Sequence, residues 1–157
     1  MGSRNCQTEL GEYTPDGIIH SDELPLVKPG MYNLCFIHVQ TALMFGRAPK
    51  VVLWFKFLEA GLYETKIPRY YNALRLIGKP RKNGQFKVGR KSDLLREFCT
   101  VFPEYRPKRL DRIPLSMYEK VIVKGRVETV EINYKQQKIP EILQYSVVTE
   151  LVEVVKI

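Results

Sequence analysis

The sequence predicts a mainly β domain with five strands and one short helix between the third strand and the fourth. Three observations predict it. Extended runs rich in Val, Ile, Tyr and Phe are separated by short polar turns, which is typical of antiparallel strands. One stretch alone repeats its apolar residues at intervals of three and four. Strands and helices do not alternate along the chain as a parallel sheet requires, so we expect an antiparallel meander.

The five strands are expected over residues 31–41, 51–59, 62–76, 121–133 and 143–155. The second, VVLWFKFLE, is the clearest strand in the chain, with apolar residues on both faces. The third contains Pro68, which cannot donate to a ladder, so we expect this strand at an edge or with a bulge. In the fourth, the apolar residues change from odd to even positions, which predicts a bulge or sharp bend at Gly125.

The helix is expected to begin after Ser92, a good N-cap, with Asp93 in its first turn where a negative charge complements the helix dipole. Its apolar stripe is Leu94, Leu95, Phe98, Val101 and Phe102. Pro103 ends it, and residues 103–120 are expected to form a loop with one helical turn. Residues 77–91 are predicted to form a long basic loop, or two short loops around a hairpin.

Basic residues exceed acidic ones, giving a net charge of +8 and a pI near 9.4. The excess is concentrated, since residues 46–112 hold 17 basic and 6 acidic residues, whereas residues 113–157 hold 6 of each. Such a field attracts polyanions. Residues 1–28 hold 2 basic and 5 acidic residues with several turn formers. We therefore expect an acidic, mobile N-terminal arm followed by one domain over residues 29–157.

Catalysis and metal binding find little support in the residues. Cys6, Cys35 and Cys99 are widely spaced and form no zinc-ligand spacing with His20 or His38, so we expect reduced thiols and no metal. The chain contains no phosphate-binding glycine loop and no paired carboxylates. We therefore expect no enzyme activity and no cofactor. Since no stretch reaches the ~18 apolar residues of a membrane span and no signal peptide is recognisable, we expect a cytoplasmic protein.

The predicted order of strands and helix resembles the OB-fold, a partly open five-stranded Greek-key barrel. More narrowly, the runs LVKPGMYNL, WFKFLEAGLYETKIPRYYN and VIVKGRVETV resemble single-stranded-DNA-binding proteins of phages and plasmids. The resemblance covers about residues 29–155 and implies a groove across the second and third strands. Carried over to this chain, the groove floor is Trp54, Lys56, Arg69 and Tyr71, and its walls are residues 45–50 and 134–138.

Rings beside cations are what a single strand requires, because bases stack on the ring and phosphates meet the cation. The sharper signal is the segment from Arg75 to Lys91, which holds seven cations and no acid. The alternatives are that Trp54 belongs to the core and that this segment only solubilises the protein. A second basic cluster lies at residues 106–112. The expected nucleic-acid-binding residues are Arg47, Lys50, Trp54, Lys56, Arg69, Tyr71, Arg75, Lys79, Arg81, Lys82, Phe86, Lys87, Arg90 and Lys91.

These residues predict a protein that binds single-stranded DNA with little sequence preference, in replication or recombination of a phage or mobile element. Oligo-dT is then expected to quench the fluorescence of Trp54, with reversal by salt. Two alternatives stay open. One is a protein–protein interaction module, such as an inhibitor or adaptor that uses the basic face toward a host or replication protein. The other is an RNA-binding OB domain. No membrane partner is expected, and the oligomeric state, a homodimer included, is open.

Overall fold

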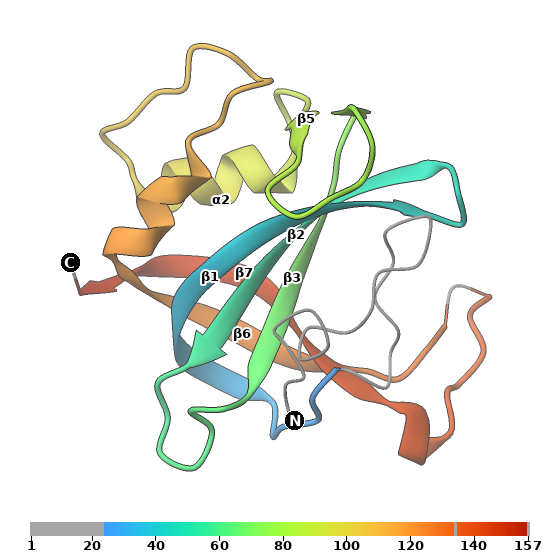
Figure 1. Cartoon of the computed structure of the whole chain (residues 1–157). Helices are drawn as coiled ribbons and strands as arrows, with labels where there is room; N and C mark the ends of the chain where they lie inside the picture. Colours follow the sequence, from blue (N-terminus) through green and yellow to red (C-terminus); the bar gives the residue numbers. More distant parts are fainter. Residues whose placement is uncertain (1–23, 134, 157) are drawn as a thin grey trace, which may run out of the picture.

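Five antiparallel strands form one sheet in the order β3-β2-β1-β6-β7, which Figure 1 shows as a strongly twisted layer. The computed structural model describes residues 24–133 and 135–156. The strands are β1 (Gly30–Met44), β2 (Ala48–Phe57), β3 (Lys66–Asn72), β6 (Ile122–Val130) and β7 (Tyr145–Lys156). The α-helix of the described residues, α2 (Asp93–Val101), lies between β3 and β6 along the chain. The predicted mainly β class and the order of three strands, a helix and two strands are confirmed.

Strand β1 belongs to both halves of the sheet. Its residues 34–44 pair with β2, whereas its residues 30–35 pair with β6. A register shift between Phe36 and His38 bends the strand where the two pairings meet. Strands β3 and β7 are the two edges of the sheet, so the predicted barrel is not closed by hydrogen bonds between the described strands.

One sequence-based expectation about an irregular strand position is confirmed, and a second is confirmed in part. Pro68 lies in β3, an edge strand, where a missing N–H costs no ladder bond on the open side. The β6–β7 register shifts between Lys124 and Gly125. A glycine is required there by packing, since a Cβ at residue 125 would lie 2.7 Å from the Leu34 side chain. The register is therefore irregular where the phase switch in the sequence indicated it, but the extra residue lies in β7, since Lys124 pairs with Glu153 and Gly125 with Leu151.

Helix α2 and the 3-10 helix η2 (Leu115–Lys120) cover one face of the sheet and enclose the main core. The Ser92 hydroxyl caps α2 by accepting a hydrogen bond from the Leu95 N–H at 3.2 Å. Phe98 of the helix and Phe55 of β2 both pack edge-on against Tyr118 of η2, with ring centroids 5.9 and 6.4 Å apart. The expected helical turn in residues 103–120 is therefore confirmed as part of the core wall.

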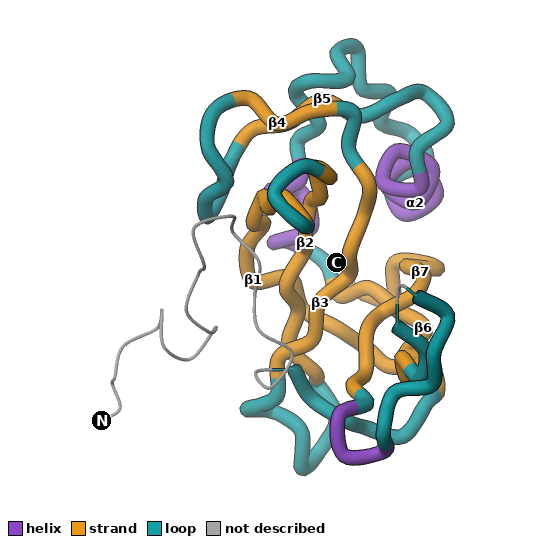
Figure 2. The backbone as a smooth tube through the Cα atoms, turned by 90° about the vertical axis from the view of Figure 1, so that its right-hand side faces the viewer, coloured by secondary structure: helices purple, strands orange, loops and turns teal. Residues whose placement is uncertain are grey.

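The basic segment predicted at residues 77–91 contributes to a hairpin, which was one of the two structures that the sequence allowed. Strands β4 (Arg75–Ile77) and β5 (Gln85–Lys87) pair with each other and lie beyond the end of the main sheet, as Figure 2 shows. The connection between them is attached to β1, because the Thr41 N–H donates to the Arg81 carbonyl (3.0 Å) and the Asn83 N–H to the Val39 carbonyl (2.7 Å).

The predicted N-terminal arm lies mostly outside the described residues. Of its expected extent, residues 24–28 are described, and they run beside β7. The Ser146 N–H donates to the Pro25 carbonyl (2.7 Å), and the Val27 N–H donates to the Ser146 hydroxyl (2.9 Å). These bonds attach the last residues of the expected arm to the sheet. At the far end of β6, a connection that contains the 3-10 helix η3 (Glu141–Leu143) leads into β7.

Candidate nucleic-acid interface

Strand ends bring most of the predicted cations together. Because β1, β2 and β3 are antiparallel, the end of β1, the start of β2 and the end of β3 lie at the same end of the sheet. The β4–β5 hairpin continues from there, since the Ala73 N–H donates to the Pro49 carbonyl (3.1 Å) and the Leu74 N–H to the Lys87 carbonyl (2.8 Å). The predicted cations in this region are Arg47, Lys50, Arg75, Lys79, Arg81, Lys82, Lys87, Arg90 and Lys91. All are exposed except Lys50 and Lys87, which are half-buried.

A second basic segment joins the hairpin at this end. The Val88 N–H donates to the Leu110 carbonyl at 3.0 Å, so residues 106–112 lie beside β5. Both segments lie above α2 in Figure 1. The exposed cations of the second segment are Arg106, Lys108, Arg109 and Arg112. We call the surface formed by residues 75–91 and 106–112, with Arg47 and Lys50, the cationic end.

The positive charges of the cationic end are mostly uncompensated. No lysine or arginine of residues 75–91 forms an ion pair with a described residue. In the second segment, Arg109 holds both carboxylate oxygens of Asp111, at 2.9 and 2.8 Å. This hydrogen bond, more than any other influence, keeps the pKa of Asp111 below its ordinary value. The remaining cations repel one another, and a bound polyanion would relieve that repulsion.

Lys56 and the second predicted wall lie away from this end. Lys56 is exposed near the end of β2 and pairs in register with Lys66 at the start of β3, at the opposite end of the strands. The wall expected at residues 134–138 follows β6, also opposite the cationic end, and its Tyr134 is outside the described residues. The prediction of one groove containing all these residues is therefore wrong, because the two ends of the strands are separated by their length.

Trp54 lies in a small apolar cluster on the outer face of the sheet, and its side chain is 1% exposed. It packs with Val52, with Leu24 and with Tyr70, and its indole N–H donates to the Gln40 side-chain oxygen at 3.2 Å. A base cannot stack on a ring that is covered on both sides. The prediction that Trp54 stacks bases is wrong for this structure, and the alternative that it is a core residue is confirmed.

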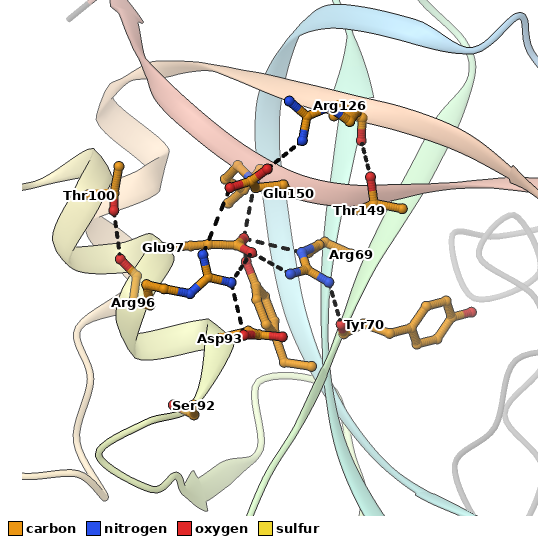
Figure 3. Close-up of polar contacts among 12 residues, drawn as sticks. Arg69, Tyr70, Ser92, Asp93, Arg96, Glu97, Thr100, Arg126, Thr149 and Glu150 are labelled. Carbon is orange, nitrogen blue, oxygen red and sulfur yellow. Dashed lines mark hydrogen bonds and ion pairs between the residues drawn. The ribbon is translucent and has the colours of Figure 1, made fainter.

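Tyr71 and Arg69 point into the main core, where both contact Glu97 of α2, as Figure 3 shows for Arg69 and Glu97. The Glu97 carboxylate accepts hydrogen bonds from the Tyr71 hydroxyl (2.6 Å), from two guanidinium nitrogens of Arg69 and from the Leu151 N–H of β7 (3.0 Å). The guanidinium carbon of Arg69 lies 4.2 Å from the centre of the Tyr71 ring. Helix α2 thus connects the two edge strands, β3 and β7, through one carboxylate.

Burial excludes Arg69 and Tyr71 from a groove floor. Burial also raises the pKa of the Tyr71 hydroxyl well above its ordinary value. For Arg69, burial is the largest single influence and opposes the charge, but the hydrogen bond to Glu97 and the neighbouring acidic groups together outweigh it, so the guanidinium pKa is raised. Phe86 is 7% exposed and belongs to the main core as well. The predicted binding roles of Arg69 and Tyr71 are therefore wrong, because their strand faces point inward, whereas Phe86 also lines a cavity that is described below.

The sequence analysis missed Tyr70, which packs in the Trp54 cluster, and Glu97, which contacts Arg69 and Tyr71. In register, Trp54 pairs with Pro68 and Val52 with Tyr70, so Tyr70 is the tyrosine beside the indole. An offset of one residue along a strand exchanges its two faces. Glu97 was detectable, because it lies three residues after Leu94, on the buried stripe of α2. A charged residue at such a position indicates a buried polar partner.

Comparison with family models, with curated proteins and with solved structures found no match to this chain. In the part of the chain that the structure describes, no group of His, Cys, Asp and Glu side chains is arranged to hold a metal ion. Among the same residues, no helix has the length and apolar character needed to span a membrane. The two described cysteines, Cys35 and Cys99, are free thiols.

Proposed function

We propose that this protein binds single-stranded DNA through its cationic end, with single-stranded RNA as the alternative ligand. The observation that carries the proposal is the meeting of two basic segments, residues 75–91 and 106–112, at one end of the sheet through the Val88–Leu110 hydrogen bond. Charges that are scattered along a chain bring little affinity, whereas charges on one surface hold a run of phosphates and displace their counterions. The ion-pair pattern supports the proposal, since the hairpin cations have no acidic partner among the described residues.

The arrangement of strands supports an OB-like fold as part of this proposal. The sheet order β3-β2-β1-β6-β7, with a helix between its third and fourth strands along the chain, fits a Greek-key barrel whose last seam is left open. Here the seam between β3 and β7 is spanned by Glu97. Since the outer strand face is occupied by the Trp54 cluster, we assign binding to the cationic end and not to that face.

Phosphate contacts supply most of the affinity in this proposal, and base contacts supply a smaller part. Tyr105 is the ring that is available near the second basic segment, with 41% of its surface exposed. Its other side packs against Phe98, with ring centroids 5.8 Å apart, which holds the ring in place. An exposed ring fixed by the core is a suitable platform for one unpaired base.

The proposal is tested with fluorescently labelled dT, rU and duplex of equal length, titrated at two salt concentrations and followed by anisotropy. We expect retention of the single strand at low salt and a steep loss of affinity as salt rises. The double variant Lys79→Glu/Lys91→Glu should weaken binding and reduce the salt slope by about 1 to 2 units. The matched control is Lys56→Glu, which reverses an exposed charge at the other end of β2 and should bind as the wild type does.

The proposal is refuted if the protein does not bind the oligonucleotide at low salt. It is also refuted if Lys56→Glu weakens binding as much as Lys79→Glu/Lys91→Glu does. Preference for rU over dT would assign the protein to RNA. Quenching of Trp54 is no longer the expected signal, since the buried indole cannot contact the oligonucleotide.

A second candidate function is a protein-interaction module, which exposed apolar side chains in the β6–β7 connection favour. Ile142 is 90% exposed there, and Ile132 and Leu143 are more than half exposed. A soluble domain seldom presents several large aliphatic side chains on one connection without a partner. The test is a stoichiometric complex that survives nuclease treatment and is lost in Ile142→Asp. Persistence of the complex in that variant, or its loss on nuclease treatment, would rule this function out.

A further inference from the structure

A cavity of about 580 Å³ opens between the two basic segments of the cationic end. Residues 84–86 of the β4–β5 hairpin form one wall and residues 111–116 form the other, with Val39 of β1 between them. The Val88–Leu110 hydrogen bond holds the two walls together close to the cavity. Its volume is in the range of pockets that bind small molecules, so one base with its sugar has room there.

The floor of this cavity is apolar. Its apolar lining residues are Val39, Phe86, Ile113, Pro114 and Leu115. Phe86, Ile113 and Leu115 are held in the main core, so the floor does not depend on a mobile side chain. A flat, weakly hydrated ring gains by leaving water for such a floor, whereas a free phosphate or a metal ion gains nothing from it.

The rim is polar and exposed. Gln85 and Ser116 lie on opposite walls with exposed side chains, and together they offer an amide donor, an amide acceptor and a hydroxyl. Unpaired bases present donors and acceptors on their edges, which such groups satisfy. The rim therefore has the chemistry to hold the edge of a heterocycle while the floor contacts its face.

The charge around the mouth favours a ligand with phosphates on either side. Arg112 is exposed on the rim and forms no ion pair with a described residue. The carboxylate of Asp111, the acid of the rim, is occupied by the guanidinium of Arg109. On the opposite side, the backbone of Arg81 adjoins the wall, where the Gly84 N–H donates to its carbonyl at 3.2 Å, and its guanidinium donates to the Ile77 and Lys79 carbonyls of the same hairpin at 3.3 and 2.9 Å. An uncharged apolar ligand would make no use of these cations.

We propose that this cavity receives one unpaired base of a bound nucleic acid, with its neighbouring phosphates held by the two basic segments. The inference rests on the proposed function and deepens it, since it adds a place for a base contact besides Tyr105, now that Trp54 and Tyr71 are known to be buried. It also gives the protein a means to prefer single strands, because a paired base cannot enter a cavity.

The test compares a dT oligonucleotide with an abasic oligonucleotide of the same length, which carries the same phosphates and lacks bases. The wild type should bind the normal strand about tenfold more tightly. Ser116→Phe places a ring in the mouth from an exposed position, and should lose most of this preference, leaving the part due to Tyr105, while binding the abasic strand as before. Ser116→Ala leaves the cavity open and is the matched control, with the preference retained.

A second measurement uses the mononucleotide dTMP and deoxyribose phosphate as probes, with the backbone amide signals of residues 84–86 and 113–116 followed by NMR. The non-proline amides should shift with dTMP and not with deoxyribose phosphate. If both oligonucleotides bind equally well, or Ser116→Phe keeps the preference, the cavity assignment is wrong and the proposed function stands. If neither oligonucleotide binds at low salt, the proposed function itself fails.

Discussion

Replacement of Glu97 by alanine is expected to destabilise the protein by about 4 kcal/mol. The carboxylate is 1% exposed and accepts hydrogen bonds from Arg69, Tyr71 and the Leu151 N–H. Removing one partner of a buried ion pair costs about 3–5 kcal/mol, because the other charge stays buried and uncompensated. An unpaired buried N–H costs about 1–3 kcal/mol more, which entry of water at the open seam would partly offset. A domain of ordinary stability, about 5–15 kcal/mol, would still fold.

The assay is urea unfolding followed by the fluorescence of Trp54, the one tryptophan of the chain, which becomes exposed when the protein unfolds. The matched control is Arg96→Ala on the same helix. Arg96 is exposed and pairs with Asp93 at 2.9 Å and at longer distance with Glu97 (3.7 Å) and Glu150 (3.8 Å), so the loss of these solvent-screened pairs should cost less than about 1 kcal/mol. The double variant Arg69→Met/Glu97→Leu removes both charges and should cost clearly less than the sum of its two single variants.

Two results would refute this account of the seam between β3 and β7. One is a loss of unfolding free energy in Glu97→Ala that is no larger than the loss in Arg96→Ala. That result would mean that the buried ion pair contributes no more to stability than the exposed ion pair. The other is strict additivity of Arg69→Met and Glu97→Leu, which would mean that the two side chains act independently despite their contact.

Three further predictions concern stability. His38 has a pKa lowered from 6.5 to about 4, by burial first and by neighbouring lysines second. The unfolded chain therefore binds a proton at His38 more readily than the folded protein does. The free energy of unfolding is then highest above pH 6.5 and decreases as the pH falls toward 4, by at most about 3 kcal/mol. Urea unfolding midpoints measured from pH 4 to 7 should show this pH dependence, and the dependence should be weaker in His38→Gln. An unchanged pH profile in the variant would exclude His38 as the source of the pH dependence. Gly125→Ala places a Cβ 2.7 Å from Leu34 and should cost about 1–3 kcal/mol in urea unfolding, and a neutral result would contradict the close packing. Ser92→Ala removes the cap on the Leu95 N–H and should cost about 1 kcal/mol, whereas Ser92→Asp should keep the stability.

Much of the fold could be predicted from the sequence because it depends on local patterns. The cap at Ser92 and the apolar stripe after it indicated α2, and Pro68 indicated an edge strand. The phase switch at Gly125 indicated an irregular register at that position, although the extra residue lies in the partner strand β7 and not in β6. Each of these features depends on the allowed backbone conformations and side-chain periods of a few consecutive residues. The extra pairing of β4 with β5 was present in the sequence only as one of two alternatives.

Less of the candidate site than of the fold could be predicted from the sequence. The concentration of cations in residues 75–91 and 106–112 is a property of the sequence. Their meeting at one end is decided by tertiary structure, through the contact between Val88 and Leu110. The cavity between them has no signal in the sequence, since its walls are more than 20 residues apart along the chain. Contacts over such separations depend on how the elements pack and not on any local pattern.

The sequence by itself determined the strand and helix periods, the helix cap and the strongly positive middle of the chain, because each is set by neighbouring residues. Only the tertiary structure decided that both faces of β2 are covered, since a strand that is apolar on both faces has no polar side to mark the solvent. That decision buried Trp54 beside Tyr70 and turned Tyr71 toward Glu97. The physical reason is the two-residue period of a strand, in which one step of register exchanges the residues that face the main core for those that face the other side of the sheet.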